Sequence, residues 1–195
     1  MNYLDDLSST IVLCVSIALT AAGLVFSVLA ISRRRPWFAL VAAAPVAWTI
    51  LVFAVYSPGY VDPVLVIVFT LALTALGVVA GSPLVALVLT LAAPNGPQLG
   101  LHGGILVRDT TSPPPQRDLE VLRGGTTIGY LERFALIGSV LAGQFAAVAI
   151  VVAIKGLGRF SELESAQARE RFIIGTLGSL TWAGTCAAAI VLTWQ

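Results

Sequence analysis

Charged side chains are scarce in this sequence, and their scarcity excludes most classes of soluble protein. Only 11% of the 195 residues are Asp, Glu, Lys or Arg, whereas 57% are hydrophobic. Soluble globular domains carry about 25% charged residues. The net charge is only +1, so no basic excess indicates nucleic acid as a partner. The composition is typical of a protein that crosses a membrane several times.

Metal-ligating and reactive side chains are also few. The chain has one His and no cluster of Cys, His and carboxylates that would predict a metal site. Its two cysteines, Cys14 and Cys186, lie within apolar runs, so we expect free thiols. No Gly-x-Ser-x-Gly sequence, paired His or aspartate motif for lipid phosphotransfer is present. We therefore expect no metal and no cofactor, and we favour a non-enzymatic protein.

The first apolar run predicts a membrane span and its orientation. Residues 10–31 are continuously apolar, and about 20 such residues cross a hydrocarbon core of about 30 Å. Asp5 and Asp6 precede the run, where a signal peptide would carry Lys or Arg. Three adjacent cations, Arg33 to Arg35, follow it. The positive-inside rule places them in the cytoplasm, which puts the N-terminus outside.

Two more spans are predicted before residue 93. They cover about residues 37–56 and 64–80, and the second returns the chain to the cytoplasm. Gly81, Ser82 and Pro83 then interrupt the apolar pattern. Residues 84–93 are too few to span, at about 10. We expect them to form a short helix that lies at the cytoplasmic interface or dips partly into the membrane.

A polar, Pro/Gly-rich segment follows, and we expect it to be a cytoplasmic loop over residues 94–126. Three consecutive prolines, Pro113 to Pro115, exclude a helix there and favour extended geometry. The apolar stretches at residues 105–107 and 119–122 flank the prolines and predict short strands.

The C-terminal part, residues 127–195, predicts a short helical hairpin and a final span. Residues 128–160 are about 33 in number, and a single helix of that length would be roughly 50 Å long. We divide the run at Gly143 and Gln144. The hairpin then sets Glu132 opposite Lys155 at one depth, where a carboxylate and an ammonium compensate each other. The last span covers about residues 172–192.

These segments predict an all-α integral membrane protein with about six transmembrane helices, including the short hairpin. Both termini are expected outside the cell. The Arg residues at 33–35, 108, 117, 123, 159, 169 and 171 then face the cytoplasm, and no Lys or Arg lies outside. This one-sidedness supports the predicted topology.

Charged residues of the hairpin and of the connector into the last span form the candidate site. Lys155, Arg159 and Glu162 stand at i, i+4 and i+7, on one helix face. Glu132 and Arg133 are adjacent and about 100° apart around a helix, so we expect Arg133 to snorkel to lipid headgroups while Glu132 meets Lys155. The candidate ligand-binding residues are Glu132, Arg133, Lys155, Arg159, Glu162 and Arg171.

Several functions are compatible with this cluster. It is either a collar of salt bridges or an anion pocket for a lipid phosphate or a phosphorylated prenyl chain. Gly124, Gly125 and Gly129 would add backbone N–H groups to such a pocket. An ion or solute pathway would need a continuous polar path from Gln144 to Glu132. We favour binding of an anionic lipid or a partner protein.

A structural subunit of a membrane complex is a further alternative. Small residues line the third and the last predicted spans, and such faces favour helix association. A homo-oligomer or a second membrane protein is therefore a possible partner.

The C-terminal third resembles a family of uncharacterised bacterial polytopic membrane proteins, a domain of unknown function. The resemblance covers about residues 125–180. It rests on the stretches Ile-Gly-x-Leu-Glu-Arg at 128–133, Gly-Gln at 143–144, Lys-x-x-x-Arg-Phe-x-Glu-Leu at 155–163, and Ile-Gly-Thr-x-x-Ser at 174–179. The resemblance implies a bacterial plasma-membrane location and no particular activity.

Overall fold

The computed structural model describes residues 3–55, 60–92, 105–107, 119–121, 125–158 and 166–194. These residues form a helical protein, and the fold class is therefore helical, as predicted. The helices are α1 (Tyr3–Ser32), the short 3-10 helix η1 (Pro36–Phe38), α2 (Ala39–Phe53), α3 (Pro63–Ala92), α4 (Gly125–Leu141), α5 (Phe145–Gly158) and α6 (Ala166–Leu192). Two three-residue strands, β1 (Ile105–Val107) and β2 (Leu119–Val121), pair antiparallel within the segments predicted as strands.

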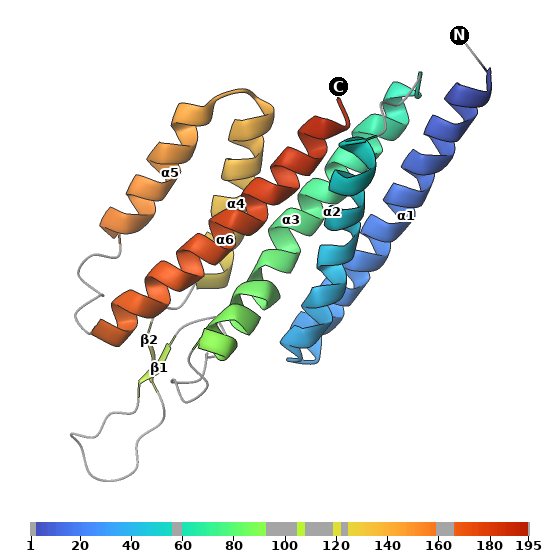
Figure 1. The fold of residues 1–195 in the computed structure, drawn as a ribbon. Helices are drawn as coiled ribbons and strands as arrows, with labels where there is room; N and C mark the ends of the chain where they lie inside the picture. The colour runs from blue at the N-terminus through green and yellow to red at the C-terminus, as the bar shows by residue number, and fades with distance from the viewer. Residues whose placement is uncertain are drawn as a thin grey trace, which may run out of the picture.

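The long helix α3 lies at the centre of the bundle, where it contacts α1, α2, α4 and α6. Figure 1 shows both chain ends and the turn between α4 and α5 at one end of the bundle. The C-terminal end of α1 lies at the opposite end. Successive helices from α1 to α6 therefore run in alternate directions along the bundle, as the sequence predicted.

The structure corrects the prediction of a separate interfacial helix at residues 84–93. Helix α3 continues without interruption from Pro63 to Ala92, through Pro83. An interior proline removes one helix hydrogen bond and crowds the carbonyl four residues earlier, but the residues that follow Pro83 pack against α6. Val85 and Leu89 lie against Gly175 of α6, at 3.6 and 3.8 Å from a Cβ built on that glycine. Tertiary contacts thus override the local signal of a helix end.

The predicted hairpin at Gly143 and Gln144 is present. Gly143 has φ +70°, a left-handed conformation that glycine adopts without strain. Its N–H donates to the carbonyl of Val140 at 3.0 Å, and the N–H of Gln144 donates to that of Ser139 at 2.8 Å. These two bonds form a Schellman motif, which ends α4 and lets α5 start in the reverse direction.

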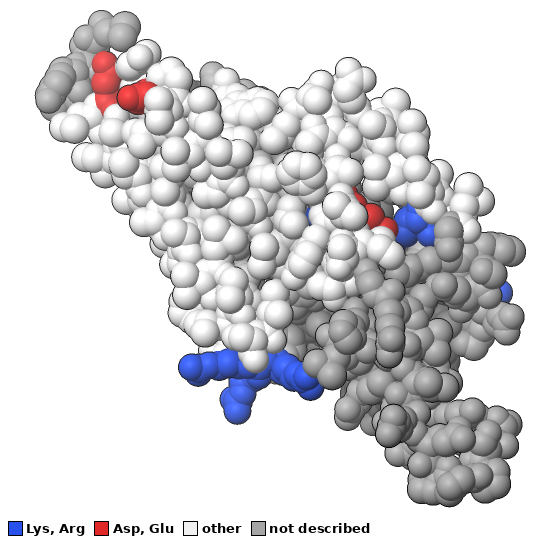
Figure 2. Space-filling view, turned by 180° about the vertical axis from the view of Figure 1, so that it is seen from behind, with Lys and Arg blue, Asp and Glu red and all other residues white. Residues whose placement is uncertain are grey.

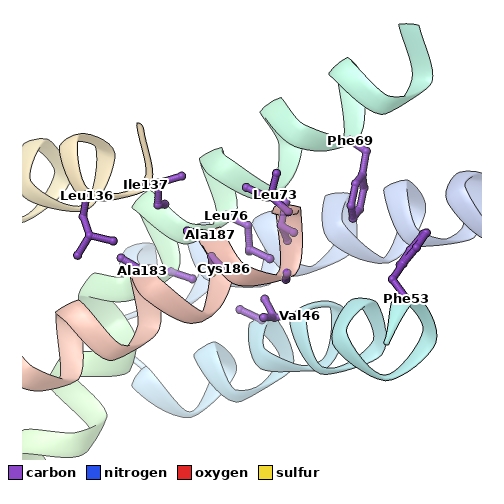
Figure 3. Packing of buried hydrophobic residues seen from close by; sticks show 14 of the residues in the cluster. Val46, Phe53, Phe69, Leu73, Leu76, Leu136, Ile137, Ala183, Cys186 and Ala187 are labelled. Atoms are coloured by element: carbon purple, nitrogen blue, oxygen red, sulfur yellow. The ribbon is translucent and has the colours of Figure 1, made fainter. Parts of the chain in front are cut away.

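The apolar core lies where α3, α4 and α6 meet, with α1 and α2 on its other side (Figure 3). Small residues allow the helices to approach closely. At Gly77 of α3, a Cβ would lie 2.8 Å from Cδ1 of Ile137 and 3.1 Å from Cβ of Cys186. The indole N–H of Trp182 also donates to the Gly77 carbonyl at 3.0 Å. Cys14 and Cys186 are both free thiols, as expected.

Four helical segments are long and apolar enough to cross a membrane. They are Asp6–Ser32, Pro36–Phe53, Pro63–Ala92 and Arg169–Leu192. The two hairpin helices are shorter, with 17 residues in α4 and 14 in α5. Among the described elements α5 contacts only α4. Its large apolar side chains are exposed, with Phe145, Ile154 and Leu157 at 69%, 65% and 78% exposure.

Charge is segregated along the bundle. Figure 2 shows a basic group at one end, where α1 terminates and Arg33 to Arg35 follow. Acidic side chains gather at the other end. There Asp6 accepts a hydrogen bond from the N–H of Tyr60, and Asp62 accepts one from the N–H of Val64 at the start of α3. Between the two ends, the described surface in this view is uncharged except for one group of acidic and basic side chains.

Candidate functional site: a cationic cavity between three helices

The most unusual side chain of the bundle is Arg133, which is 3% exposed. It lies eight residues after the start of α4 at Gly125, so its Cα is about 12 Å along the helix axis. Its guanidinium lies between α3 and α6. This position corrects the prediction that Arg133 snorkels to headgroups. Gly81 and Gly129 lack the Cβ atoms that would approach it, so a buried position is sterically accessible.

Neutral groups hold the Arg133 guanidinium. Nε donates to the carbonyl of Val78 at 2.8 Å, Nη2 to Oγ of Ser82 at 2.8 Å, and Nη1 to Oγ of Ser179 at 3.2 Å. The guanidinium also lies over the ring of Tyr130, with Cζ 5.4 Å from the ring centroid. Five N–H donors belong to an arginine, and these three bonds leave two of them for another acceptor.

No carboxylate among the described residues forms an ion pair with Arg133. Its neighbour Glu132 points to α5 instead and pairs with Lys155. This ion pair confirms the predicted hairpin register, and both side chains are largely buried, at 12% and 17% exposure. The two adjacent residues of α4 therefore serve different contacts: Glu132 joins the helices of the hairpin, and Arg133 joins α4 to α3 and α6.

A cavity of about 190 Å³ opens beside the Arg133 side chain. Helices α3, α4 and α6 form its walls, and Lys155 of α5 and Arg171 of α6 also line it. Its polar part contains Arg133, Lys155, Arg171, Ser82, Thr126, Thr176 and Ser179, and its apolar part contains Val85, Ala86, Leu89, Ile128 and Phe172. None of the described lining residues is an Asp, a Glu or a His.

Two polar atoms in the walls of this cavity have no hydrogen-bond partner among the described residues. They are Nη1 of Arg171 and Oγ1 of Thr176, and both are buried. Other hydroxyls in the bundle bond to a carbonyl of their own helix, as Thr20 does to Ser16 at 2.7 Å and Thr49 to Pro45 at 2.8 Å. Buried polar groups are usually satisfied, so the two orphaned donors mark a place for a polar ligand.

The first turn of α4 adds backbone donors to the cavity. Gly125, Thr126 and Ile128 lie in that turn and line the cavity. The first N–H groups of a helix have no partner within the helix, and the helix dipole places a partial positive charge there. Together with the three cations, this helix end makes the cavity suitable for an anion.

The structure brings together four of the six predicted site residues. Arg133, Lys155 and Arg171 line the cavity, and Glu132 contacts Lys155. Arg159 and Glu162 lie outside the described residues. Arg171 joins the site from α6, whereas its neighbours Arg169 and Glu170 are exposed.

Sequence reasoning missed the contribution of α3. Ser82 and the Val78 carbonyl bind Arg133, although the sequence around Gly81-Ser82-Pro83 indicated only a break. It also did not place Ser179 and Thr176 in the candidate site. Ser179 instead accepts a bond from Arg133, and Thr176 lines the cavity. The sequence signal that could have identified these site residues is the presence of small polar side chains within otherwise apolar helices.

Comparison of the chain with protein-family models, with curated proteins and with solved structures gave no match. The resemblance to the uncharacterised bacterial family therefore stays a prediction.

Proposed function

We propose that the protein is a polytopic protein of a bacterial plasma membrane. The four long apolar helices supply four crossings, and α4 and α5 form a short hairpin that supplies two more. The basic end that follows α1 faces the cytoplasm, and both termini lie outside. The charge segregation along the bundle supports this orientation. The exposed apolar side chains of α5 support contact of the hairpin with lipid.

The function that the site supports best is binding of an anionic ligand, either a lipid phosphate or another phosphorylated molecule, at the cytoplasmic side. The observation that carries this proposal is the buried Arg133 guanidinium, which lacks an acidic partner among the described residues. A buried cation is costly unless a counter-charge compensates it. A ligand anion beside Arg133 would supply that charge.

The alternative of a closed salt-bridge collar is less well supported. Glu132 and Lys155 do form such a pair. However, Arg133 is held by neutral groups, and Nη1 of Arg171 has no partner among the described residues. Two cations at the same cavity thus have no acidic partner among the described residues, which a self-contained collar does not explain.

The alternative of an ion or solute pathway is also less well supported. Such a pathway would run from the cavity toward Gln144 along α4. The next turn of α4 beyond Arg133 carries Leu136 and Ile137, which are buried among apolar residues of α3 and α6. Buried apolar residues thus follow Arg133 along α4 in the direction of Gln144.

Lipid retention by the purified protein tests the proposal. The protein is extracted in mild detergent, and bound phospholipid and phosphorylated lipids are quantified by native mass spectrometry. The variant is Arg171→Gln, and Arg169→Gln is the matched control because it removes the same charge from an exposed position two residues away. We expect Arg171→Gln to retain several-fold less anionic lipid than wild type and Arg169→Gln to retain the wild-type amount.

Equal retention by all three proteins would contradict anion binding in this cavity. Arg133→Gln provides a second test because it removes the buried charge itself. Since Arg133 also connects three helices, its thermal unfolding is measured in parallel. A folded Arg133→Gln protein that keeps its full complement of anionic lipid would also overturn the proposal.

A further inference from the structure

We infer that the ligand carries a terminal phosphate monoester on an apolar chain, rather than a phosphodiester headgroup. This inference rests on the proposed anion-binding function and specifies its ligand class. It follows from three properties of the cavity: its uncompensated charge, the arrangement of its donors and the division of its wall into polar and apolar parts.

The charge of the cavity matches a dianion. Three cations line it, Arg133, Lys155 and Arg171. Lys155 is neutralised by Glu132, whereas Arg133 and Arg171 have no ion-pair partner among the described residues. The uncompensated charge of the described walls is therefore about two positive units. A phosphate monoester carries about −1.5 to −2 charges at pH 7, whereas a phosphodiester has a single acidic group and carries −1.

The donors surround the cavity from more than one side. Arg133 of α4 has two N–H groups left for a ligand, and Arg171 of α6 has an unpartnered Nη1. Thr176 of α6 adds an unpartnered hydroxyl. Donors from several directions suit a terminal phosphate, which has three unsubstituted oxygens. A diester offers only two.

The apolar part of the wall accounts for the rest of the ligand. Val85 and Leu89 of α3, together with Phe172 of α6 and Ile128 of α4, line the same cavity as the cations. The volume of about 190 Å³ is smaller than the ~300–1,000 Å³ of a typical small-molecule pocket. It accommodates a headgroup and the first part of a chain, and the remainder of the chain must extend outside it.

Binding of three probes to the detergent-solubilised wild-type protein tests the inference. They are dodecyl phosphate, its methyl diester and inorganic phosphate. The two dodecyl compounds are titrated below their critical micelle concentrations, and binding of all three is measured by calorimetry. We expect the monoester to bind at least about 10-fold more tightly than the diester at pH 7.5 and low salt, because the second negative charge interacts with two nearby cations. Inorganic phosphate should bind more weakly than dodecyl phosphate because it lacks the chain.

The pH dependence of binding supplies an independent readout. The second pKa of a phosphate monoester is about 6, so lowering the pH from 7.5 to 5 converts the dianion to a monoanion. Among the described residues, the charged groups facing the cavity are Arg133, Arg171 and Lys155 with its partner Glu132, and α3 contributes none. We expect the preference for the monoester to fall to within about twofold at pH 5, while the diester affinity changes little.

The variants separate the inference from the proposed function. Arg171→Gln should reduce the preference for the monoester over the diester to about threefold or less, and Arg169→Gln should preserve it. Equal binding of monoester and diester by wild type would overturn the inference and leave anion binding intact. Binding of neither would overturn both. If inorganic phosphate binds as tightly as dodecyl phosphate, the inference that the ligand carries an apolar chain is wrong, and the ligand is a soluble phosphate.

Discussion

Gly81 of α3 lies directly against the buried side chain of Arg133 on α4. A Cβ at Gly81 would approach Cδ and Nε of that arginine to 2.5 Å and its Cζ to 2.8 Å. Contacts this short do not occur between real atoms, so Arg133 takes its position only because residue 81 is glycine. The candidate site therefore depends on a residue of α3 that carries no side chain.

Substitution of Gly81 by Ala should therefore damage the site without removing any charged group. The Arg133 guanidinium must move, and it loses bonds to Val78 and Ser82 as it does so. We expect a loss of about 1–3 kcal/mol in the free energy of unfolding, together with reduced retention of anionic lipid. Thermal unfolding in detergent and native mass spectrometry measure the two effects.

Gly138→Ala is the control for this substitution. Gly138 also lies within a helix, and a Cβ there meets no atom within 4 Å. Ala is favoured over Gly in a helix by about 0.5–1 kcal/mol, so this variant should be as stable as wild type or slightly more stable. Identical unfolding and lipid retention in Gly81→Ala and wild type would show that Arg133 adapts freely.

Thr176→Val should separate ligand binding from stability. The Thr176 hydroxyl is buried and has no partner among the described residues, so replacing it with a methyl group removes an unsatisfied polar atom. We expect the ligand-free protein to gain about 1 kcal/mol in the free energy of unfolding and to bind dodecyl phosphate more weakly. A variant that is both less stable and unchanged in binding would contradict this role of the hydroxyl.

The ion pair between Glu132 and Lys155 should hold α5 to the bundle, since α5 contacts only α4 among the described elements. Glu132→Gln leaves a largely buried ammonium unpaired, and we expect a cost of about 1–3 kcal/mol. The double exchange Glu132→Lys with Lys155→Glu should restore most of the stability. It places a carboxylate at the cavity, so this double variant should bind phosphate more weakly than wild type. Thermal unfolding measures the stability of these variants, and calorimetry measures their binding of phosphate.

Gly77 should be sensitive to any added side chain because α3, α4 and α6 meet there. A Cβ would lie 2.8 Å from Cδ1 of Ile137 and 3.1 Å from Cβ of Cys186. Gly77→Ala should therefore lower the free energy of unfolding by about 1–3 kcal/mol. Gly184→Ala on α6 is the matched control, since a Cβ there meets no atom within 4 Å. An unchanged unfolding temperature in Gly77→Ala would mean that the helices separate without cost.

Cysteine labelling of intact cells tests the membrane topology. Single cysteines replace Tyr60, Gln144 or Ser32, all exposed positions, in a Cys14→Ala background. The buried Cys186 is left in place. A membrane-impermeant maleimide should label positions 60 and 144 from outside and position 32 only after permeabilisation. Labelling of 144 and 32 from the same side would exclude a hairpin that crosses the membrane.

Much of the local structure was predictable from the sequence because it depends on nearby residues. The length of the apolar run at residues 128–160 required a turn, and Gly143 supplies the left-handed conformation that the turn uses. The position of this turn determines which residues of α4 and α5 lie opposite each other, so the contact between Glu132 and Lys155 was predicted correctly. The end of the third span was predicted wrongly, because Pro83 was interpreted from local propensity alone.

What the sequence by itself determined is the apolar, helical character of the chain, the hairpin and one ion pair across it. Hydrophobic length, turn chemistry and the cost of an isolated charge all act over a few residues or along one hairpin. Only the tertiary structure decided the direction of Arg133 and the continuity of α3 through Pro83. The direction of Arg133 depends on partners about 50 residues away in the sequence, Ser82 at a separation of 51 and Ser179 at 46. The continuity of α3 depends on contacts of Val85 and Leu89 with Gly175 of α6. No local pattern specifies which helices will meet, because that choice depends on how Gly77, Gly81 and the small residues of α6 pack together.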